Sequence, residues 1–170
     1  MLGKVVVGMF PNRAAGLTGT VDLAPEFEID PDVVATSQAV KVAPVAPAAR
    51  VTVNGESVLR LPASAGPGVP LTCVDGADCV PSGPMALLGG MTISAGPATS
   101  TATAMSVAFA SGRAPATLDG TLDGTPLRLG AGVGLDITDD ANAHLRSLFG
   151  APLVGHFARP AASFTQTRLP

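Results

Sequence analysis

The stretch LTCVDGADCV, residues 71 to 80, holds both cysteines of the chain, which are its residues best suited to chemistry. Cys73 and Cys79 could bind a metal, form a redox pair or join in a disulfide. Structural zinc needs two further ligands, and the two histidines of the chain, His144 and His156, lack the spacing found in zinc sites. A thioredoxin-like redox pair is spaced C-x-x-C at the start of a helix, unlike this pair. We therefore expect no metal here.

A disulfide between Cys73 and Cys79 is the interpretation that fits the spacing best. The bond would close a loop of seven residues around an Asp-Gly turn. The loop-entropy model assigns such a loop roughly 2 to 2.5 kcal/mol of stabilisation. Two free thiols remain the alternative that the sequence leaves open.

Other residue types that could do chemistry do not converge on a motif. Several aspartates, among them Asp119 and Asp123, sit in Asp-Gly pairs, which form turns and can also bind calcium, but no EF-hand spacing is present. A G-x-S-x-G nucleophile elbow is missing from the sequence. The GAGVG run at 130–134 lacks the strand and helix that a dinucleotide loop requires. We expect a protein that is not an enzyme, with no catalytic residues, no metal and no cofactor.

The composition narrows the class of protein further. Charged residues make up 14% of the chain against about 25% on average, while 46% of the residues are hydrophobic. A net charge of −3 without a Lys/Arg cluster argues against nucleic-acid binding. No stretch reaches the roughly 18 apolar residues of a membrane span, so we also expect no membrane role. A surface this poor in charge suits a subunit covered by neighbours, although a genome rich in G and C would give a similar composition.

Short strands and turns dominate the predicted elements. PEFEID, residues 25–30, alternates acidic and apolar side chains as a half-buried strand does. VTVNGESVL, residues 51–59, predicts a hairpin because Asn54-Gly55 can take the positive φ values of a type I′ turn. Strands are also expected in MALLGGMTISAG and TATAMSVAFASG, and the two LDGT units predict a further hairpin or tight meander.

A single helix is predicted near the C-terminus. Thr138 or Asp139 can cap it, and Gly150 can end it. Ala141, Leu145, Leu148 and Phe149 would share one face. We therefore predict a single, mainly β domain, a β-sandwich or barrel-like fold with one short C-terminal helix and extended terminal arms. Its divisions are an N-terminal strand and arm region (1–48), a β core (50–137), the helix (138–150) and an extended C-terminal arm (151–170).

The composition of the whole chain resembles that of the capsid decoration proteins of tailed phages and other virion structural proteins, because it combines low charge, many small residues and short predicted strands. The resemblance is one of composition and carries no specific motif. It implies a non-enzymatic subunit in a virion, made in the host cytoplasm, whose partners are copies of itself and a capsid or other lattice protein. The alternative is an exported, extracellular and monomeric β-sandwich module for binding or adhesion, stabilised by calcium.

Aromatic rings dominate the energetics of protein interfaces, so the phenylalanines are the expected anchors of such an assembly. At least two of them should belong to the core of the chain instead. Basic residues toward the C-terminus would complement the acidic segment between Asp22 and Asp32 on a neighbour. The predicted interface residues are Phe10, Phe27, Phe149, Phe157, Phe164, Arg159 and Arg168.

Overall fold

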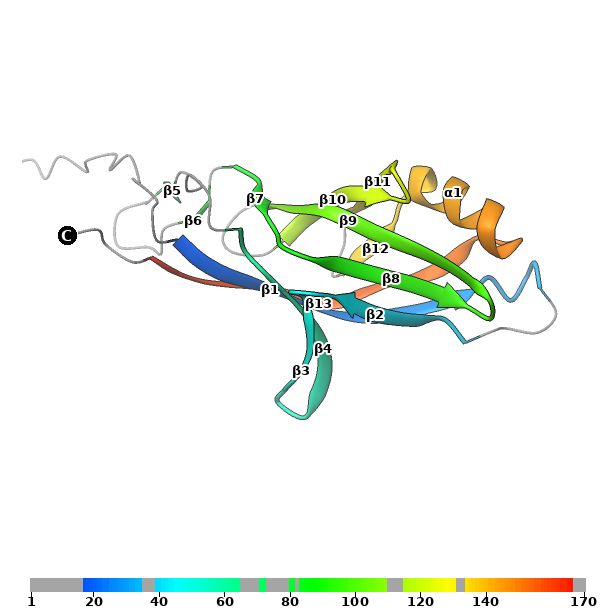
Figure 1. Cartoon of the computed structure of the whole chain (residues 1–170), viewed down its shortest axis with the longest axis horizontal. Coiled ribbons are helices and arrows are strands. Elements are labelled where there is room, and N and C mark those ends of the chain that lie inside the picture. Colours follow the sequence, from blue (N-terminus) through cyan, green and yellow to red (C-terminus); the bar gives the residue numbers. More distant parts are fainter. Residues whose placement is uncertain are drawn as a thin grey trace, which may run out of the picture.

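The structure is a computed structural model that describes residues 17–34, 39–64, 71–72, 80–81, 83–109, 115–130 and 134–166. In this part of the chain most residues are in strands, which wind into a nearly closed barrel-like sheet, and a short helix lies at one end (Figure 1). The predicted mainly β, barrel-like fold with one C-terminal helix is confirmed.

The strands of the main sheet pair with their neighbours in antiparallel fashion. In chain order they are β1 (Leu17–Ile29), β2 (Lys41–Val45), β3 (Ala49–Val53), β4 (Glu56–Pro62), β7 (Met85–Ala86), β8 (Gly90–Ala95), β9 (Ala98–Phe109), β10 (Pro115–Leu122), β11 (Thr125–Gly130), β12 (Leu135–Ile137) and β13 (Leu153–Gln166). Their order in the sheet is β2-β8-β9-β10-β11-β12-β13-β1-β4-β3, with β7 paired to β9. A separate two-stranded sheet joins β5 (Leu71–Thr72) and β6 (Val80–Pro81).

Alternating side chains fill the interior of the barrel. In β8, for example, Met91, Ile93 and Ala95 point inward while the residues between them are half-buried. Every strand that contributes such a face adds Leu, Val or Met to one continuous apolar cluster, so the barrel interior is packed rather than hollow. The largest side chains with almost no exposure are Phe157, Leu23, Leu59, Leu61, Met91, Met105, Leu118, Leu122, Leu135, Leu145 and Leu153.

Two tight turns form where the sequence predicts them. Asn54 and Gly55 have φ values of 50° and 83° and join β3 to β4, and Asp123 and Gly124 repeat these values between β10 and β11. The first LDGT unit differs, because its Asp-Gly pair lies inside β10 rather than in a turn. A Cβ on Gly120 would lie 2.6 Å from the Met105 sulfur, so glycine there permits the close approach of β9.

The C-terminal segment is extended, as expected, but it is not a free arm. β13 pairs with β1 from Leu17↔Gln166 to Ile29↔Leu153 and also pairs with β12. Phe157 is fully buried, and its ring meets Phe27 edge to face with the centroids 4.7 Å apart. The strand belongs to the core because Leu153 and Phe157 point into the barrel. The predicted division of the chain is corrected accordingly: the β core begins in β1 and ends in β13, well outside residues 50–137.

The helix forms within one residue of the predicted bounds. α1 runs from Asp139 to Phe149, and Gly150 ends it in the left-handed conformation, donating its N–H to the Arg146 carbonyl at 3.0 Å. Ala141 and Leu145 are buried against the barrel as predicted, whereas Leu148 is 38% exposed. The Thr138 hydroxyl does not cap the helix; it donates to the Arg128 carbonyl instead.

Candidate functional site

The predicted interface residues fall in different environments. Phe157 is buried in the core, and Phe27 and Phe149 are partly buried against it. These positions agree with the expectation that at least two phenylalanines serve the core. Arg159 is exposed and forms an ion pair with Glu56 of the same chain.

The remaining predicted positions are not covered by the description of side chains. Phe10, Arg168 and both cysteines lie outside the described residues, and Phe164 is described only through its backbone pairing with Gly19. β5 and β6, which flank Cys73 and Cys79, pair as Leu71↔Pro81 and Thr72↔Val80. The disulfide stays a prediction.

One cluster unites the residue types of a serine-protease triad. Ser100, which is completely buried, donates from Oγ to Asp123 Oδ2 at 2.6 Å, and His144 Nε2 lies 3.1 Å from the same oxygen. The Thr101 N–H donates to Asp123 Oδ1 at 2.9 Å. These contacts hold the pKa of Asp123 below its ordinary value. The hydrogen bond from the Ser100 hydroxyl contributes most to this shift, followed by the Thr101 amide and then by His144.

The order of contacts excludes triad chemistry in this cluster. In a catalytic triad the histidine lies between the nucleophile and the carboxylate and takes the proton of the hydroxyl. Here the Asp123 carboxylate lies between Ser100 and His144, so the histidine does not contact the serine oxygen. The cluster instead ties the start of β9, the β10–β11 turn and α1 together. Sequence reasoning identified Asp123 as a turn residue and missed its partners, which come from elements far apart in the chain.

Two further groups of ionisable residues join neighbouring strands. The Arg60 guanidinium makes two hydrogen bonds of 2.7 Å to the Asp22 carboxylate and links β4 to β1. His156 Nε2 lies 3.2 Å from Glu26 Oε2 across the β1–β13 pair. Among the residues that the structure describes, no three His, Cys, Asp or Glu side chains gather closely enough to hold a metal ion.

A break in the barrel wall beside β1 offers a candidate binding surface. Residues 20–23 of β1 pair with β4, and Glu28 forms a single bridge to Ala39 just before β2. In the described structure no strand ladder pairs residues 24–27 on this edge of β1. We call this break the seam.

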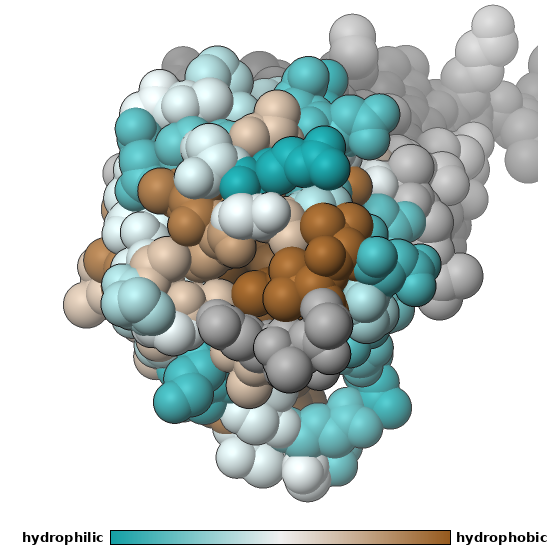
Figure 2. Space-filling view, turned by 90° about the vertical axis from the view of Figure 1, so that its right-hand side faces the viewer, coloured by the Kyte–Doolittle hydropathy of each residue, from teal (hydrophilic) through white to brown (hydrophobic). Residues whose placement is uncertain are grey.

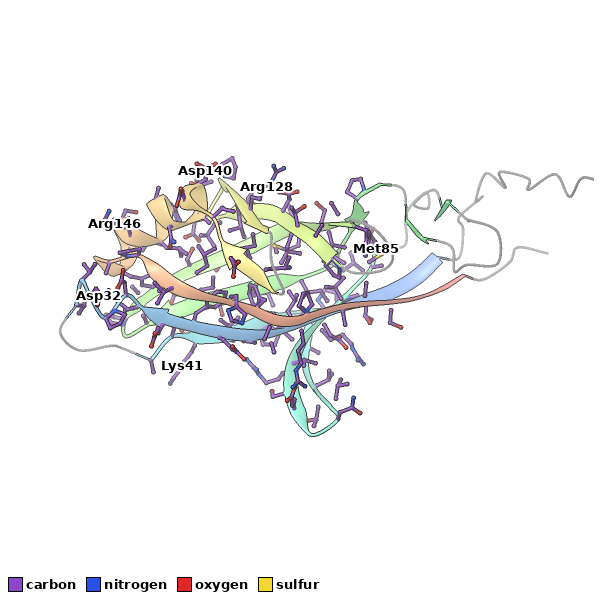
Figure 3. All side chains as sticks on the ribbon, turned by 180° about the vertical axis from the view of Figure 1, so that it is seen from behind. Asp32, Lys41, Met85, Arg128, Asp140 and Arg146 are labelled. Atoms are coloured by element: carbon purple, nitrogen blue, oxygen red, sulfur yellow. The ribbon has the colours of Figure 1, made fainter. Side chains whose placement is uncertain are left out.

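A groove of about 890 Å³ lies over the seam. Residues from β1, β2, β3 and β13 line it: Pro25, Glu26, Phe27, Glu28, Val40, Lys41, Val42, Ala43, Arg50, Val154 and Gly155. The β3–β4 hairpin projects from the barrel beside it, and Lys41 lies on the same side (Figures 1 and 3). The groove therefore has an acidic rim on β1, a basic rim formed by Lys41 and Arg50, and Phe27 between them.

Backbone groups as well as side chains face the seam. The Gly19 carbonyl accepts from the Ala63 N–H at 2.6 Å on the β4 side, whereas the Asp30 N–H donates to the Pro152 carbonyl at 2.9 Å on the β13 side. Because successive residues direct their backbone groups to opposite edges of a strand, Pro25 and Phe27 direct theirs to the seam. On the other wall, the Val42 carbonyl accepts a hydrogen bond from the Arg50 guanidinium.

A second surface of interest is the end of the barrel where α1 ends. Figure 2 shows apolar side chains gathered on this end of the molecule, and Asp32 and Arg146 mark it in Figure 3. Val33 is 50% exposed in the turn that contains Asp32, and Leu148 is exposed on the last turn of α1. We call this surface the apolar end.

The chain was compared with known protein families, curated proteins and solved structures. No family model matches it, and neither the curated proteins nor the solved structures gave a match. In the described part of the chain, no helix combines the length and apolar character needed to cross a membrane.

Proposed function

We propose that this chain is a non-enzymatic structural subunit of a large protein assembly. The observation that supports the proposal is the contrast between a packed interior and an incomplete wall. The barrel core is filled with apolar side chains, whereas the seam leaves backbone groups of β1 beside a groove that the partly buried Phe27 helps to line. Exposed strand edges are templates for pairing with another chain, and natural proteins usually cover them.

The apolar end adds a second contact surface of the kind that assemblies bury. Val33 and Leu148 are large apolar side chains that are exposed at this end of the barrel. Together with the low content of charged residues, such surfaces favour a subunit covered by neighbours. We assign the subunit to a virion, as a capsid decoration protein that binds copies of itself and a lattice protein.

Native mass spectrometry of the untagged full chain without reductant tests this proposal. A trimer or larger assembly is the expected result, because stable association buries roughly 1,600 Å² and needs surfaces such as the seam and the apolar end. The same spectrum shows whether the mass is lower by the pair of hydrogen atoms that a Cys73–Cys79 disulfide removes.

A monomer at every concentration would favour a different function. The groove has the volume of a small-molecule or short-peptide site, which typically lies between about 300 and 1,000 Å³. Such a result would support an exported binding or adhesion module that uses the groove for a ligand. Thermal melting with and without calcium would then test calcium stabilisation of the Asp-Gly turns.

A further inference from the structure

We propose that the seam receives an extended strand from a second copy of this chain, formed by its residues 4–10, KVVVGMF. This inference rests on the proposed assembly function and names the contact by which copies would join. The seam is the place where one added strand could pair with two walls at once, β1 on one side and β2 on the other. Strand addition of this kind gains affinity from main-chain hydrogen bonds and specificity from alternate side chains.

The geometry of the seam suits an extended backbone better than a compact ligand. The Phe27 N–H and the Pro25 carbonyl face it from β1, and the Val42 carbonyl faces it from β2. The guanidinium of Arg50 binds the Val42 carbonyl, in the position where a paired strand would place an N–H. An incoming strand replaces that contact and continues the hydrogen-bonding of the barrel wall.

The side chains around the seam select an apolar strand with a basic residue. Phe27 lines the groove and is only partly buried where its ring packs on Phe157, which favours valine or another apolar side chain beside it. Glu28 is exposed on the β1 rim and forms no ion pair with any residue that the structure describes. A lysine at the end of the added strand would supply the missing partner.

The first residues of the chain match these requirements. Residues 1–16 lie outside the described residues and precede β1, which begins at Leu17. They contain the run Val5-Val6-Val7 next to Lys4, and the first acidic residue of the chain is Asp22. The segment is therefore rich in strand-forming residues and complementary in charge to the β1 rim.

The length of the connection favours a second copy over the same chain. The centre of the seam lies nine residues along β1 from Leu17, or about 30 Å at 3.3 Å per residue. The ten residues from Val7 to Leu17 span at most about 33–36 Å when fully extended. Within one molecule this connection would have to double back along β1 with almost no slack, whereas a neighbouring copy has no such constraint.

A charge swap in the full chain tests the contact. Glu28→Lys and Lys4→Glu should each weaken self-association about fivefold or more, measured as the midpoint of a concentration series in native mass spectrometry. The double variant should restore self-association, because residues 4 and 28 then again carry charges of opposite sign. Asp136→Lys is the matched control, since it makes the same charge change at an exposed site outside both the groove and the apolar end and should leave the midpoint within about twofold. Thermal melting checks that every variant folds.

Cross-linking identifies the occupant and its origin. A photoreactive residue in place of Val6 should yield dimer-sized products whose fragments join residues 4–10 to residues 24–28 or 40–43. Products of monomer size would overturn the second copy as the source, and dimer-sized products whose fragments join residue 6 only to residues outside the seam would overturn the seam as the binding site of this segment.

The same experiments separate this inference from the proposed function. If the chain assembles but none of the charge variants changes the midpoint of self-association, the seam contact is overturned and the proposed assembly function still stands. A full chain that stays monomeric at every concentration would overturn both.

Discussion

The two sides of the barrel differ in how their strands are joined. From β8 through β9, β10, β11, β12 and β13 to β1, each strand pairs with the next, and α1 packs beside β11, β9 and β13. On the other side, the edge of β1 that faces away from β13 is only partly paired. β4 pairs with one end of it, a single bridge joins the other end to Ala39, and the seam lies between them.

Because of this difference, we expect substitutions on one side of the barrel to affect mainly its stability and substitutions on the other side to affect mainly binding. The continuous side has a complete ladder and a buried core, so substitutions there should change the free energy of unfolding. The seam side has exposed charges and incomplete pairing, so substitutions there should change association more than folding. The two sides meet at β1 and β13, where both consequences can be tested.

The largest effect is expected at Gly155, where the β1 backbone leaves no room for a side chain on β13. Gly155 has a φ of 125°, and a Cβ at this position would overlap the Glu26 carbonyl oxygen. Gly155→Ala should therefore cost more than about 3 kcal/mol of unfolding free energy, because backbone on both strands would have to move. Urea denaturation measures this value.

Gly124→Ala provides the matched control for that substitution. Gly124 has a φ of 83° in the β10–β11 turn, and nothing lies within 4 Å of an added Cβ. The substitution should cost only the strain of the left-handed conformation, about 1–2 kcal/mol. Equal losses at the two glycines would contradict the close approach of β13 to β1.

A smaller effect, dependent on pH, is expected from the cluster on the continuous side. Asp123→Asn keeps a residue that tolerates the φ of 50° but removes the charge that Ser100, Thr101 and His144 contact. The loss should be about 1 kcal/mol at neutral pH, since the Asp123 side chain is 37% exposed and water screens the contacts. Because folding lowers the pKa of Asp123, its stabilisation is complete above the ordinary value of 3.8 and is lost as the pH falls through the lower, folded pKa.

Chemical denaturation of both proteins from pH 7 down to pH 3 measures this dependence. The stability difference between the wild type and Asp123→Asn should shrink as the solution becomes more acidic than pH 3.8. Asp136→Asn, at an exposed site that forms no ion pair within the described residues, is the matched control for the substitution and should change the stability at pH 7 by less than about 0.5 kcal/mol. A difference that stays constant with pH would show that the Asp123 charge does not stabilise the fold.

Local signals in the sequence predict the turns well. Asn54-Gly55 and Asp123-Gly124 form turns because few other residue pairs take positive φ values at low cost. Gly150 ends α1 for the same reason. These features depend on a few neighbouring residues, so the sequence alone suffices to place them.

Pairings between distant segments are harder to predict. β13 contains Pro160 and a bulge opposite Asp22 and Ala24, which interrupt the alternation that marks a strand, and its partner β1 lies more than a hundred residues earlier. The Ser100 cluster combines residues from three elements, and the seam results from β4 and Ala39 each pairing with only part of one edge of β1. Neither is encoded in a local pattern.

The smallest effect on the unfolding free energy is expected from the ion pairs. One pair on each side of the barrel allows a direct comparison. Arg60 reaches Asp22 with two hydrogen bonds at the β1–β4 junction beside the seam, and the Asp22 side chain is only 16% exposed. The Asp22 carboxylate that accepts both bonds raises the pKa of Arg60. Arg128 on the continuous side makes one bond of 2.7 Å to Asp119 and is 66% exposed.

Arg60→Gln should therefore cost about 1 kcal/mol of unfolding free energy, while Arg128→Gln should produce no measurable change. The reason lies in geometry as well as exposure, since a two-pronged contact is ordered in a way that a single exposed one is not. Urea titrations at low and high salt measure both values, and salt should weaken the Arg60 contribution. If the two variants were equally stable, the Asp22–Arg60 ion pair would add nothing measurable to the pairing of β1 with β4. The β1–β4 junction beside the seam would then be held by its backbone hydrogen bonds alone.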